Sequence, residues 1–265
     1  MKKILLLGAS GFLGSKLLEL APDNIDLCSS YKEKRLETKK QQVEIDLLDF
    51  DNVRQKINGI RPQLVIYAAR LHPFDSNRLK AEEVATEFVE IIKAVGSKLI
   101  YISSDAVFEG KKGNYKELDE TKPLTNYGKA KLASETVIRN SLKDFIIVRP
   151  SYIYDDRFNK LDKREFQLLK QIKNVETIYR FKDAFRSPIL VTDLARAIWK
   201  LADSDFVGIV HVAGERKSIY QFFKELAKKV GLDPKLIKPN LISDENQDIA
   251  PDTSLNTDLV DRILK

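Results

Sequence analysis

Short apolar runs alternate with amphipathic stretches along the first 150 residues. Most of these runs are apolar at consecutive positions, which is typical of strands covered on both faces of a parallel sheet. Strands are predicted over residues 4–7, 25–30, 43–45, 64–69, 99–102 and 145–148. Helices are predicted between them over residues 15–21, 51–57, 79–95 and 127–140. This alternation predicts a doubly wound, Rossmann-like α/β sheet.

The alternation becomes less regular after Pro150. Helices are predicted over residues 163–173, 192–202 and 218–230, and strands over 176–179 and 209–212. The last stretch, 242–265, is polar and ends in a short helical segment. We expect a Rossmann domain over residues 1–150 and a smaller C-terminal lobe over 151–265, whose elements can interleave with the first. The cleft between two such lobes is the natural ligand site.

Composition excludes several classes of function. The 265 residues carry a formal charge of +6, but opposite charges are mixed along the chain and the only dense basic run is 32–40, so no nucleic-acid partner is expected. A single cysteine excludes a disulfide framework, and two histidines far apart in the sequence make a histidine-based metal site unexpected. No apolar run approaches the roughly 18 residues of a membrane helix, and no signal peptide is evident. We expect a cytoplasmic protein that binds no membrane.

Three glycines separate the first predicted strand from the first predicted helix. Their spacing is G-x-x-G-x-x-G, and they begin at residue 8. A dinucleotide site needs a tight turn, a close approach of backbone to pyrophosphate, and free amides at a helix N-terminus. Ordinary turns also contain glycine, but the place of this motif favours dinucleotide binding. The expected contact residues are Gly8, Ser10, Gly11, Phe12, Leu13 and Gly14.

The residues after the second predicted strand bear on the choice of dinucleotide. An NAD site usually has an acidic residue about 20 positions after the glycines, for the ribose 2′-hydroxyl. Here the chain continues with Ser30, Tyr31 and Lys32, Arg35 follows closely, and Asp26 lies too early. The missing carboxylate and the cations favour NADP, with NADPH preferred and NADH as an alternative. The competing interpretation is a charged, solvated loop.

A Tyr-x-x-x-Lys pattern occurs twice in the chain. Residues i and i+4 share a helix face, so Lys131 can stabilise the phenolate of Tyr127 and lower its pKa from about 10, as proton exchange near neutral pH requires. Tyr220 and Lys224 repeat the spacing, and we interpret them as ordinary helix surface and core. Only the first pair has a serine pair correctly placed before it. That serine pair ends at Ser104, at the end of a predicted strand where such folds bind ligands.

The chain resembles the extended short-chain dehydrogenase/reductase superfamily, and within it the dTDP-4-dehydrorhamnose reductase family. The likeness is carried by residues 102–110 (ISSDAVFEG), 113–117 (GNYKE) and 123–131 (PLTNYGKAK). The family has S-T-D-x-V-F-D-G, G-x-Y-x-E and P-x-N-x-Y-G-x-x-K at these places. Further support comes from residues 149–150, 193–195 and 211–214, and the similarity extends over nearly the whole length.

The resemblance implies an NADPH-dependent reduction of a nucleotide-linked 4-keto-6-deoxy sugar, most closely dTDP-4-dehydrorhamnose to dTDP-rhamnose. It implies Tyr127 as the general acid, Lys131 as its partner and Ser104 as the residue that orients the keto oxygen. Both Tyr127 and Lys131 are also expected to contact the cofactor. The further expected cofactor contacts are Asp46, Leu47, Ala68, Ala69 and Arg70. The expected substrate contacts are Ser104, Asp105, Phe108, Tyr152 and Arg186.

Departures from the family pattern concern the substrate more than the cofactor. Ala106 stands where the family often has an aromatic residue, and Tyr152 where it often has tryptophan. Arg186 also resembles the arginine by which sugar-nucleotide epimerases meet a phosphate. Two alternatives therefore stay open: an NADP-binding regulatory subunit like the methionine adenosyltransferase β subunit, and a sugar-nucleotide epimerase or dehydratase. A homodimer is a further expectation, and the residues of the family's magnesium site at a dimer contact cannot be placed in this sequence.

Overall fold

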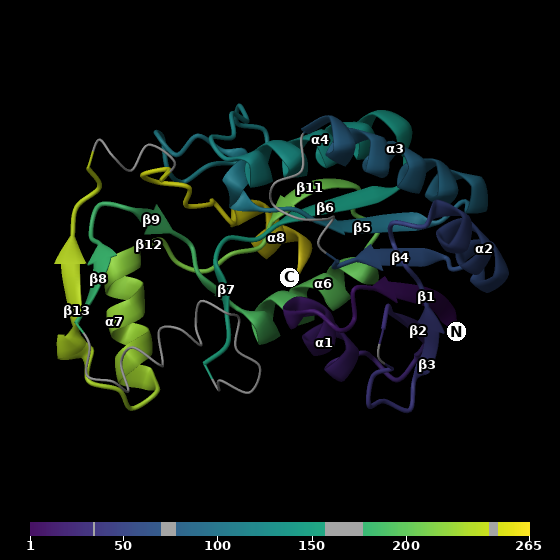
Figure 1. Cartoon of the computed structure of the whole chain (residues 1–265), viewed down its shortest axis with the longest axis horizontal. Helices are drawn as coiled ribbons and strands as arrows, with labels where there is room; N and C mark the ends of the chain where they lie inside the picture. The colour runs from purple at the N-terminus through teal and green to yellow at the C-terminus, as the bar shows by residue number, and fades with distance from the viewer. Residues whose placement is uncertain (34, 70–77, 157–176, 244–248) are drawn as a thin grey trace.

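The computed structural model describes residues 1–33, 35–69, 78–156, 177–243 and 249–265. Its centre is a seven-stranded sheet with the order β11-β6-β5-β4-β1-β2-β3, in which every pairing is parallel (Figure 1). The order reverses between β1 and β4, which confirms the predicted doubly wound fold. The strands are β1 (Lys2–Leu7), β2 (Ile25–Tyr31), β3 (Gln41–Glu44), β4 (Leu64–Tyr67), β5 (Lys98–Ile102), β6 (Phe145–Arg149) and β11 (Gly208–His211).

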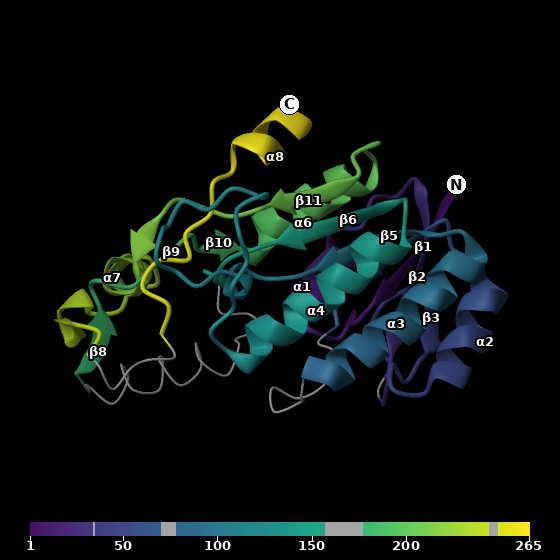
Figure 2. The same cartoon turned by 90° about the horizontal axis from the view of Figure 1, so that it is seen from above.

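Helices cover both faces of this sheet (Figures 1 and 2). One face is covered by α2 (Phe50–Ile60), α3 (Arg78–Val95) and α4 (Asn126–Ser141), and the other by α1 (Phe12–Glu19), α6 (Val191–Ala202) and α8 (Asp258–Ile263). A hydrophobic core lies on each face of the sheet. Successive residues of a strand point to opposite faces, so β1 contributes side chains to both cores. Leu5 and Leu7 pack into the first core, whereas Ile4 and Leu6 pack into the second. No helix among the described residues is long and apolar enough to cross a membrane.

Besides α8, two elements that follow residue 150 belong to the large sheet layer. β11 pairs with β6 at the sheet edge, and α6 packs against α1. The chain therefore returns to the Rossmann layer after it has left it.

The other described elements after residue 150 lie outside the large sheet, and most of them gather at one end of the molecule (Figure 1). They are β7 (Ile153–Tyr154), β8 (Ile178–Phe181), β9 (Phe185–Arg186), β10 (Ile189–Leu190), β12 (Lys217–Ser218), α7 (Ile219–Lys229), η2 (Pro234–Leu236) and β13 (Ile237–Asn240). A separate small core forms between α7 and the β8–β13 pair. The helix predicted over 163–173 and the first residue of the strand predicted over 176–179 lie outside the described residues.

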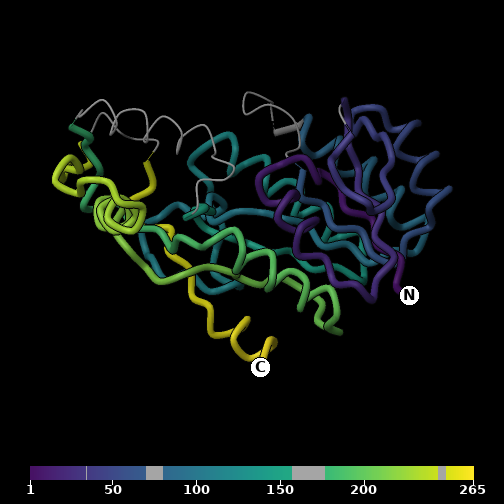
Figure 3. The backbone as a smooth tube through the Cα atoms, turned by 90° about the horizontal axis from the view of Figure 1, so that it is seen from below, coloured from purple at the N-terminus to yellow at the C-terminus, as the bar shows by residue number. Residues whose placement is uncertain are grey.

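Residues 249–256 form a C-terminal segment that connects this end of the molecule with the large sheet (Figure 3, yellow). The Phe185 N–H donates to the Pro251 carbonyl at 2.6 Å, and the Tyr115 N–H donates to the Ser254 carbonyl at 2.9 Å. Leu255 adds its side chain to a small buried cluster with Phe108 and Tyr115. A stretch that is polar in sequence thus becomes part of the interior.

Gly14 allows α1 to lie close to the preceding turn, because a Cβ at this position would be 2.0 Å from the Gly8 carbonyl oxygen. At Gly59 in α2 a Cβ meets nothing within 4 Å. We expect Gly14→Ala to lower the free energy of unfolding by about 1–3 kcal/mol through overpacking. Gly59→Ala should raise it by up to about 1 kcal/mol, because alanine is the better helix former. Urea denaturation measures both, and an unchanged Gly14→Ala protein would contradict the close packing.

Candidate active site

The predicted glycine motif forms the turn between β1 and α1. Gly8 has a φ of +81°, and its N–H donates to the Ser30 hydroxyl at 3.2 Å. The Gly11 N–H donates back to the Gly8 carbonyl at 2.9 Å. Gly11 is the N-cap of α1 and no side chain caps this helix within the described ranges, while Ser10 and Gly11 are exposed. Uncapped amides at a helix N-terminus suit an anion, so the turn fits the pyrophosphate of a dinucleotide.

The remaining residues predicted for this turn divide between the turn and the core. Leu13 is buried and Phe12 packs partly into the core on the α1 side of the sheet. The Ala68 N–H donates to the Leu7 carbonyl at 3.0 Å, and a Cβ on Gly8 would be 2.5 Å from the Ala69 nitrogen. The end of β4 therefore lies directly against the glycine turn. Arg70 lies outside the described residues.

The ends of β2 and β3 bring two predicted cofactor residues into contact. The Lys32 ammonium lies 3.1 Å from the Asp46 carboxylate, and both side chains are substantially exposed. A hydrogen bond from the Leu48 N–H, and next the Lys32 contact, lower the pKa of Asp46. Leu47 packs partly against the core on the α2 side, and Arg35 is exposed. An anion at this place would therefore compete with Asp46 for Lys32.

The first turn of α4 carries Tyr127 to the end of β5. The Thr125 hydroxyl caps the helix by accepting from the Gly128 N–H at 3.1 Å. A Cβ on Gly128 would lie 2.1 Å from the Ala106 carbonyl oxygen, so this turn packs against the short helix η1 (Asp105–Val107). η1 directly follows Ser104, so the first turn of α4 and the strand-end serine are neighbours. In the sequence, Tyr127 lies 22 positions after the first residue of η1.

Lys131 is buried beneath Tyr127, where its ammonium group meets the end of β5. Its Nζ donates to the Ile102 carbonyl at 2.8 Å and to the Tyr101 hydroxyl at 3.4 Å. The same nitrogen lies 4.8 Å from the centroid of the Tyr101 ring and 5.8 Å from that of Tyr127. A buried cation at this separation favours negative charge on the phenol. The Tyr-x-x-x-Lys spacing thus produces the ring-to-ammonium proximity that proton transfer needs.

The second Tyr-x-x-x-Lys pair has the same spacing in different surroundings. The Lys224 Nζ donates to the Tyr220 hydroxyl at 3.3 Å on the exposed side of α7. Tyr220 otherwise packs partly against the small core of the C-terminal lobe. The interpretation of this pair as helix surface and core is confirmed.

The two serines that end β5 have different partners. Ser103 is buried, and its hydroxyl donates to the Glu135 carboxylate. Ser104 is half-buried; its hydroxyl donates to the Asp105 carboxylate at 3.1 Å and accepts from the Ala106 N–H at 3.2 Å. Of this pair, Ser104 keeps the partial exposure that contact with a substrate requires.

Asp105 is buried and binds groups of the chain itself. Its Oδ2 accepts from the hydroxyls of Ser151 and Thr253, both at 2.8 Å, while its other oxygen accepts from Ser104. The carboxylate therefore ties the end of β5 to the C-terminal segment. The contact of Asp105 with the substrate stays a prediction, and in the structure three hydroxyl groups surround this carboxylate.

Phe108 also belongs to the interior. Its side chain has no exposed surface; the ring stacks on Tyr115 with centroids 4.2 Å apart and meets His211 edge-on at 5.7 Å. The substrate contact of Phe108 stays a prediction, and in the structure the ring is fully buried and packs against Tyr115 and His211.

Tyr152 and Arg186 are partly exposed residues at the boundary with the C-terminal lobe. The Tyr152 ring packs against Phe222 and Phe223, with centroids 5.3 and 5.9 Å away. Arg186 Nη1 donates to the carbonyls of Phe185 and Ala250 at 2.7 and 2.9 Å. Burial lowers the pKa of Arg186, yet a guanidinium keeps its charge at neutral pH. Both stay predicted substrate contacts.

A buried ion pair beneath the site is a feature that the sequence motifs did not indicate. Arg149 contacts both carboxylate oxygens of Glu135, at 3.0 and 2.6 Å, and donates to the Glu117 carbonyl at 3.1 Å. Glu135 follows Lys131 by four residues, so Tyr127, Lys131 and Glu135 lie along one face of α4. The i+4 spacing that continues from Lys131 to Glu135 was the feature of the sequence that could have indicated this residue. Removal of either partner leaves a buried charge unpaired, which costs about 3–5 kcal/mol.

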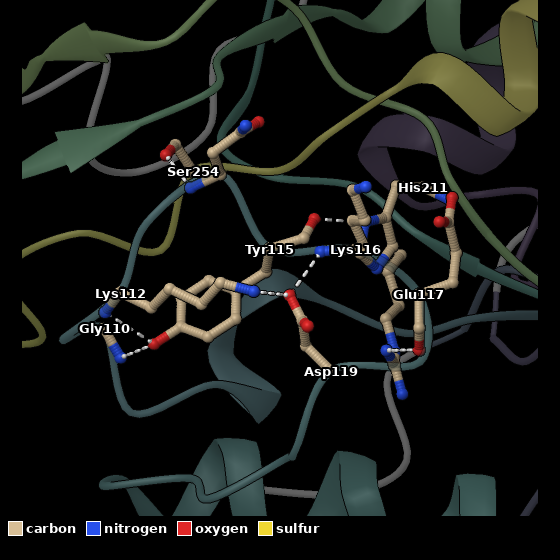
Figure 4. Close-up of polar contacts among 10 residues, drawn as sticks. Gly110, Lys112, Tyr115, Lys116, Glu117, Asp119, His211 and Ser254 are labelled. Atoms are coloured by element: carbon tan, nitrogen blue, oxygen red, sulfur yellow. Dashed lines mark hydrogen bonds and ion pairs between the residues drawn. The ribbon is translucent and has the colours of Figure 1, made fainter.

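The loop before α4 is fixed by hydrogen bonds around Tyr115 (Figure 4). The Tyr115 hydroxyl accepts from the N–H groups of Gly110 and Lys112, each at 3.1 Å. Asp119 accepts from the Lys112 ammonium at 2.6 Å, and the His211 Nδ1 lies 3.1 Å from the Tyr115 carbonyl oxygen. Burial, and next the charge of Arg149, lower the pKa of His211 to about 3.

His211 makes stability depend on pH. The unfolded chain binds a proton at this residue below about pH 6.5, whereas the folded chain does so only below about pH 3. The free energy of unfolding should therefore fall as the pH drops through this window, by up to about 1.4 kcal/mol per pH unit. Glutamine does not titrate, so the free energy of unfolding of His211→Gln should fall less steeply with decreasing pH. Urea denaturation at roughly pH 7 to pH 4 measures this difference. Parallel curves for the two proteins would contradict this assignment.

The fold and the site define a dinucleotide-binding α/β protein with a tyrosine–lysine pair at the ligand edge of its sheet. The chain belongs to the RmlD substrate binding domain family, whose model matches residues 1–254.

Relatives and solved structures agree with this family. The dTDP-4-dehydrorhamnose reductase of Aggregatibacter actinomycetemcomitans is 28% identical, over 81% of this chain and 74% of that protein. The methionine adenosyltransferase 2 subunit beta of Bos taurus is 25% identical, over 90% and 75%. A structure described as a hypothetical dTDP-4-dehydrorhamnose reductase from Sulfolobus tokodaii is 31% identical, with a TM-score of 0.85 over 100% of this chain and 95% of that one. The dTDP-4-dehydrorhamnose reductase of Bacillus anthracis in complex with NADP is 25% identical, with a TM-score of 0.81 over 99% and 93%.

Proposed function

We propose that the protein is an NADPH-dependent reductase of a nucleotide-linked 4-keto-6-deoxy sugar, and that its reaction converts dTDP-4-dehydrorhamnose to dTDP-rhamnose. One observation carries the proposal: Lys131 is buried under Tyr127 at the end of β5, beside the half-exposed Ser104. β1 and β5 are parallel strands of one sheet, so this group and the glycine turn lie at the same sheet edge. Membership of the family and the NADP-bound reductase from Bacillus anthracis support the same activity.

Each part of the site has a role in this reaction. Bound NADPH supplies a hydride to the carbonyl carbon, C4 of the sugar. Tyr127 donates a proton to the carbonyl oxygen, so the ketone becomes an alcohol, and Lys131 stabilises the phenolate that remains. Ser104 is the hydrogen-bond partner of that oxygen. Its hydroxyl hydrogen points to Asp105 in the structure, so it must rotate in order to donate to the substrate.

The cofactor is held at three places in this proposal. The β1–α1 turn binds the pyrophosphate through its uncapped amides, and Ala68 and Ala69 at the end of β4 flank it. Lys32 and Arg35 bind the 2′-phosphate that distinguishes NADP from NAD.

The alternatives differ in what they require of these residues. The relative from Bos taurus supports a regulatory subunit, which needs the dinucleotide site but no proton donor. A dehydratase needs a second acid beside Asp105, and this position is Ala106. A homodimer and a cytoplasmic location stay predictions.

Tyr127→Phe should remove turnover and leave NADPH affinity nearly intact, because only the proton donor is lost. We expect a decrease in kcat of roughly 10²- to 10⁴-fold. NADPH oxidation is followed with dTDP-4-dehydrorhamnose made in situ. Tyr220→Phe is the matched control, since it removes the same hydroxyl from the second Tyr-x-x-x-Lys pair.

Turnover by the Tyr127→Phe protein at the wild-type rate would mean that another residue supplies the proton. Binding of NADPH without turnover by the wild type would favour the regulatory subunit.

Arg35→Ala should weaken the binding of NADPH but not the binding of NADH. One charge-assisted hydrogen bond to the 2′-phosphate corresponds to roughly a tenfold rise in Kd. Titration calorimetry with each cofactor measures the difference. Arg196→Ala is the control, because Arg196 is an exposed arginine of α6 in an ion pair with Asp193. Equal weakening of both cofactors would place the 2′-phosphate elsewhere.

A further inference from the structure

We propose that Tyr101 is a positioning residue of the reaction, which holds the Lys131 ammonium group beside Tyr127. This inference rests on the proposed function and assigns a role to a residue outside the glycine, serine and tyrosine–lysine motifs. Tyr101 is the penultimate residue of β5 and is 3% exposed.

Tyr101 engages Lys131 with both parts of its side chain. The hydroxyl oxygen accepts from the lysine Nζ at 3.4 Å, and this nitrogen lies 4.8 Å from the ring centroid. A cation near an aromatic face is attracted by the ring. The neighbouring Ile102 carbonyl accepts from the same nitrogen at 2.8 Å. Two successive residues of a central strand thus orient the end of a side chain that is otherwise flexible.

A neutral phenol can orient an ammonium group without cancelling its charge. Burial raises the pKa of Tyr101 well above its ordinary value of 10, so this residue stays uncharged at the pH of catalysis. The carboxylate one turn further along α4, Glu135, is neutralised by Arg149 at 2.6 Å. A carboxylate in the place of Tyr101 would hold Lys131 as firmly, but it would also oppose the effect of the lysine on Tyr127. The phenol therefore leaves the charge available to Tyr127.

The adjacent strand provides a matched control for this residue. Tyr67 of β4 is opposite Tyr101 in the sheet register, and the two ring centroids are 5.9 Å apart. Its hydroxyl is buried and has no hydrogen-bond partner among the described residues. Tyr67→Phe and Tyr101→Phe therefore remove the same atom from neighbouring buried positions, but only the second removes a contact with Lys131.

The test compares pH–rate profiles of NADPH oxidation for the wild type and both variants. Tyr127 is active as the neutral phenol, and Lys131 favours the phenolate. A loosened lysine should therefore move the alkaline limb of the profile to higher pH. For Tyr101→Phe we expect a shift of about half a pH unit, a roughly fivefold lower kcat and an unchanged KM. Tyr67→Phe should match the wild type in all three.

Three results of the kinetic comparison would overturn the proposal. These are a Tyr101→Phe profile that coincides with the wild type, a lower kcat with an unmoved alkaline limb, and equal changes in Tyr67→Phe. Thermal unfolding establishes that both variants are folded. Ultraviolet titration of tyrosinate, with Tyr127→Phe subtracted, reports the ionisation of Tyr127 without any substrate. Absence of turnover in the wild type would count against the proposed function, whereas unchanged ionisation of Tyr127 in Tyr101→Phe would count against this inference.

Discussion

The contact between the first turn of α4 and the end of β5 is the constraint on which the site depends. Gly128 allows this turn to approach the Ala106 carbonyl, and Lys131 then reaches the Ile102 carbonyl at 2.8 Å. A buried ammonium group is stable only when its donors are satisfied, so these carbonyl and hydroxyl partners permit a lysine where the fold would otherwise favour an apolar residue. The same contact fixes Tyr127 over the sheet edge.

A second layer of polar contacts surrounds this arrangement and connects distant parts of the chain. Asp105 joins the end of β5 to Thr253 in the C-terminal segment, and Arg149 joins β6 to Glu135 of α4. Buried polar groups of this kind are stable when each has its partner and expensive when one is removed. Asp105, a residue of the sequence motif, therefore also holds the end of β5 in place through Ser151 and Thr253.

Much of the site could be predicted because its chemistry is encoded over short distances. The glycine turn spans seven positions and the tyrosine–lysine pair five, and the strand-end serine follows an apolar run. Such patterns are visible without knowledge of the fold. The burial of Asp105 and Phe108 could not be predicted, because a motif shows which residues recur together but not which of them are buried.

The sequence by itself determined the doubly wound fold, the order of its main elements and the tyrosine–lysine pair that we propose transfers a proton. Hydrophobic periodicity and turn chemistry are local properties, so they can be recognised in the chain before it folds. Only the tertiary structure decided that β11 returns to the sheet, that Tyr101 meets Lys131 and that Thr253 meets Asp105. These contacts join residues 30 and 148 positions apart. Their partners are set by how helices and strands pack, and no local pattern of residues specifies them.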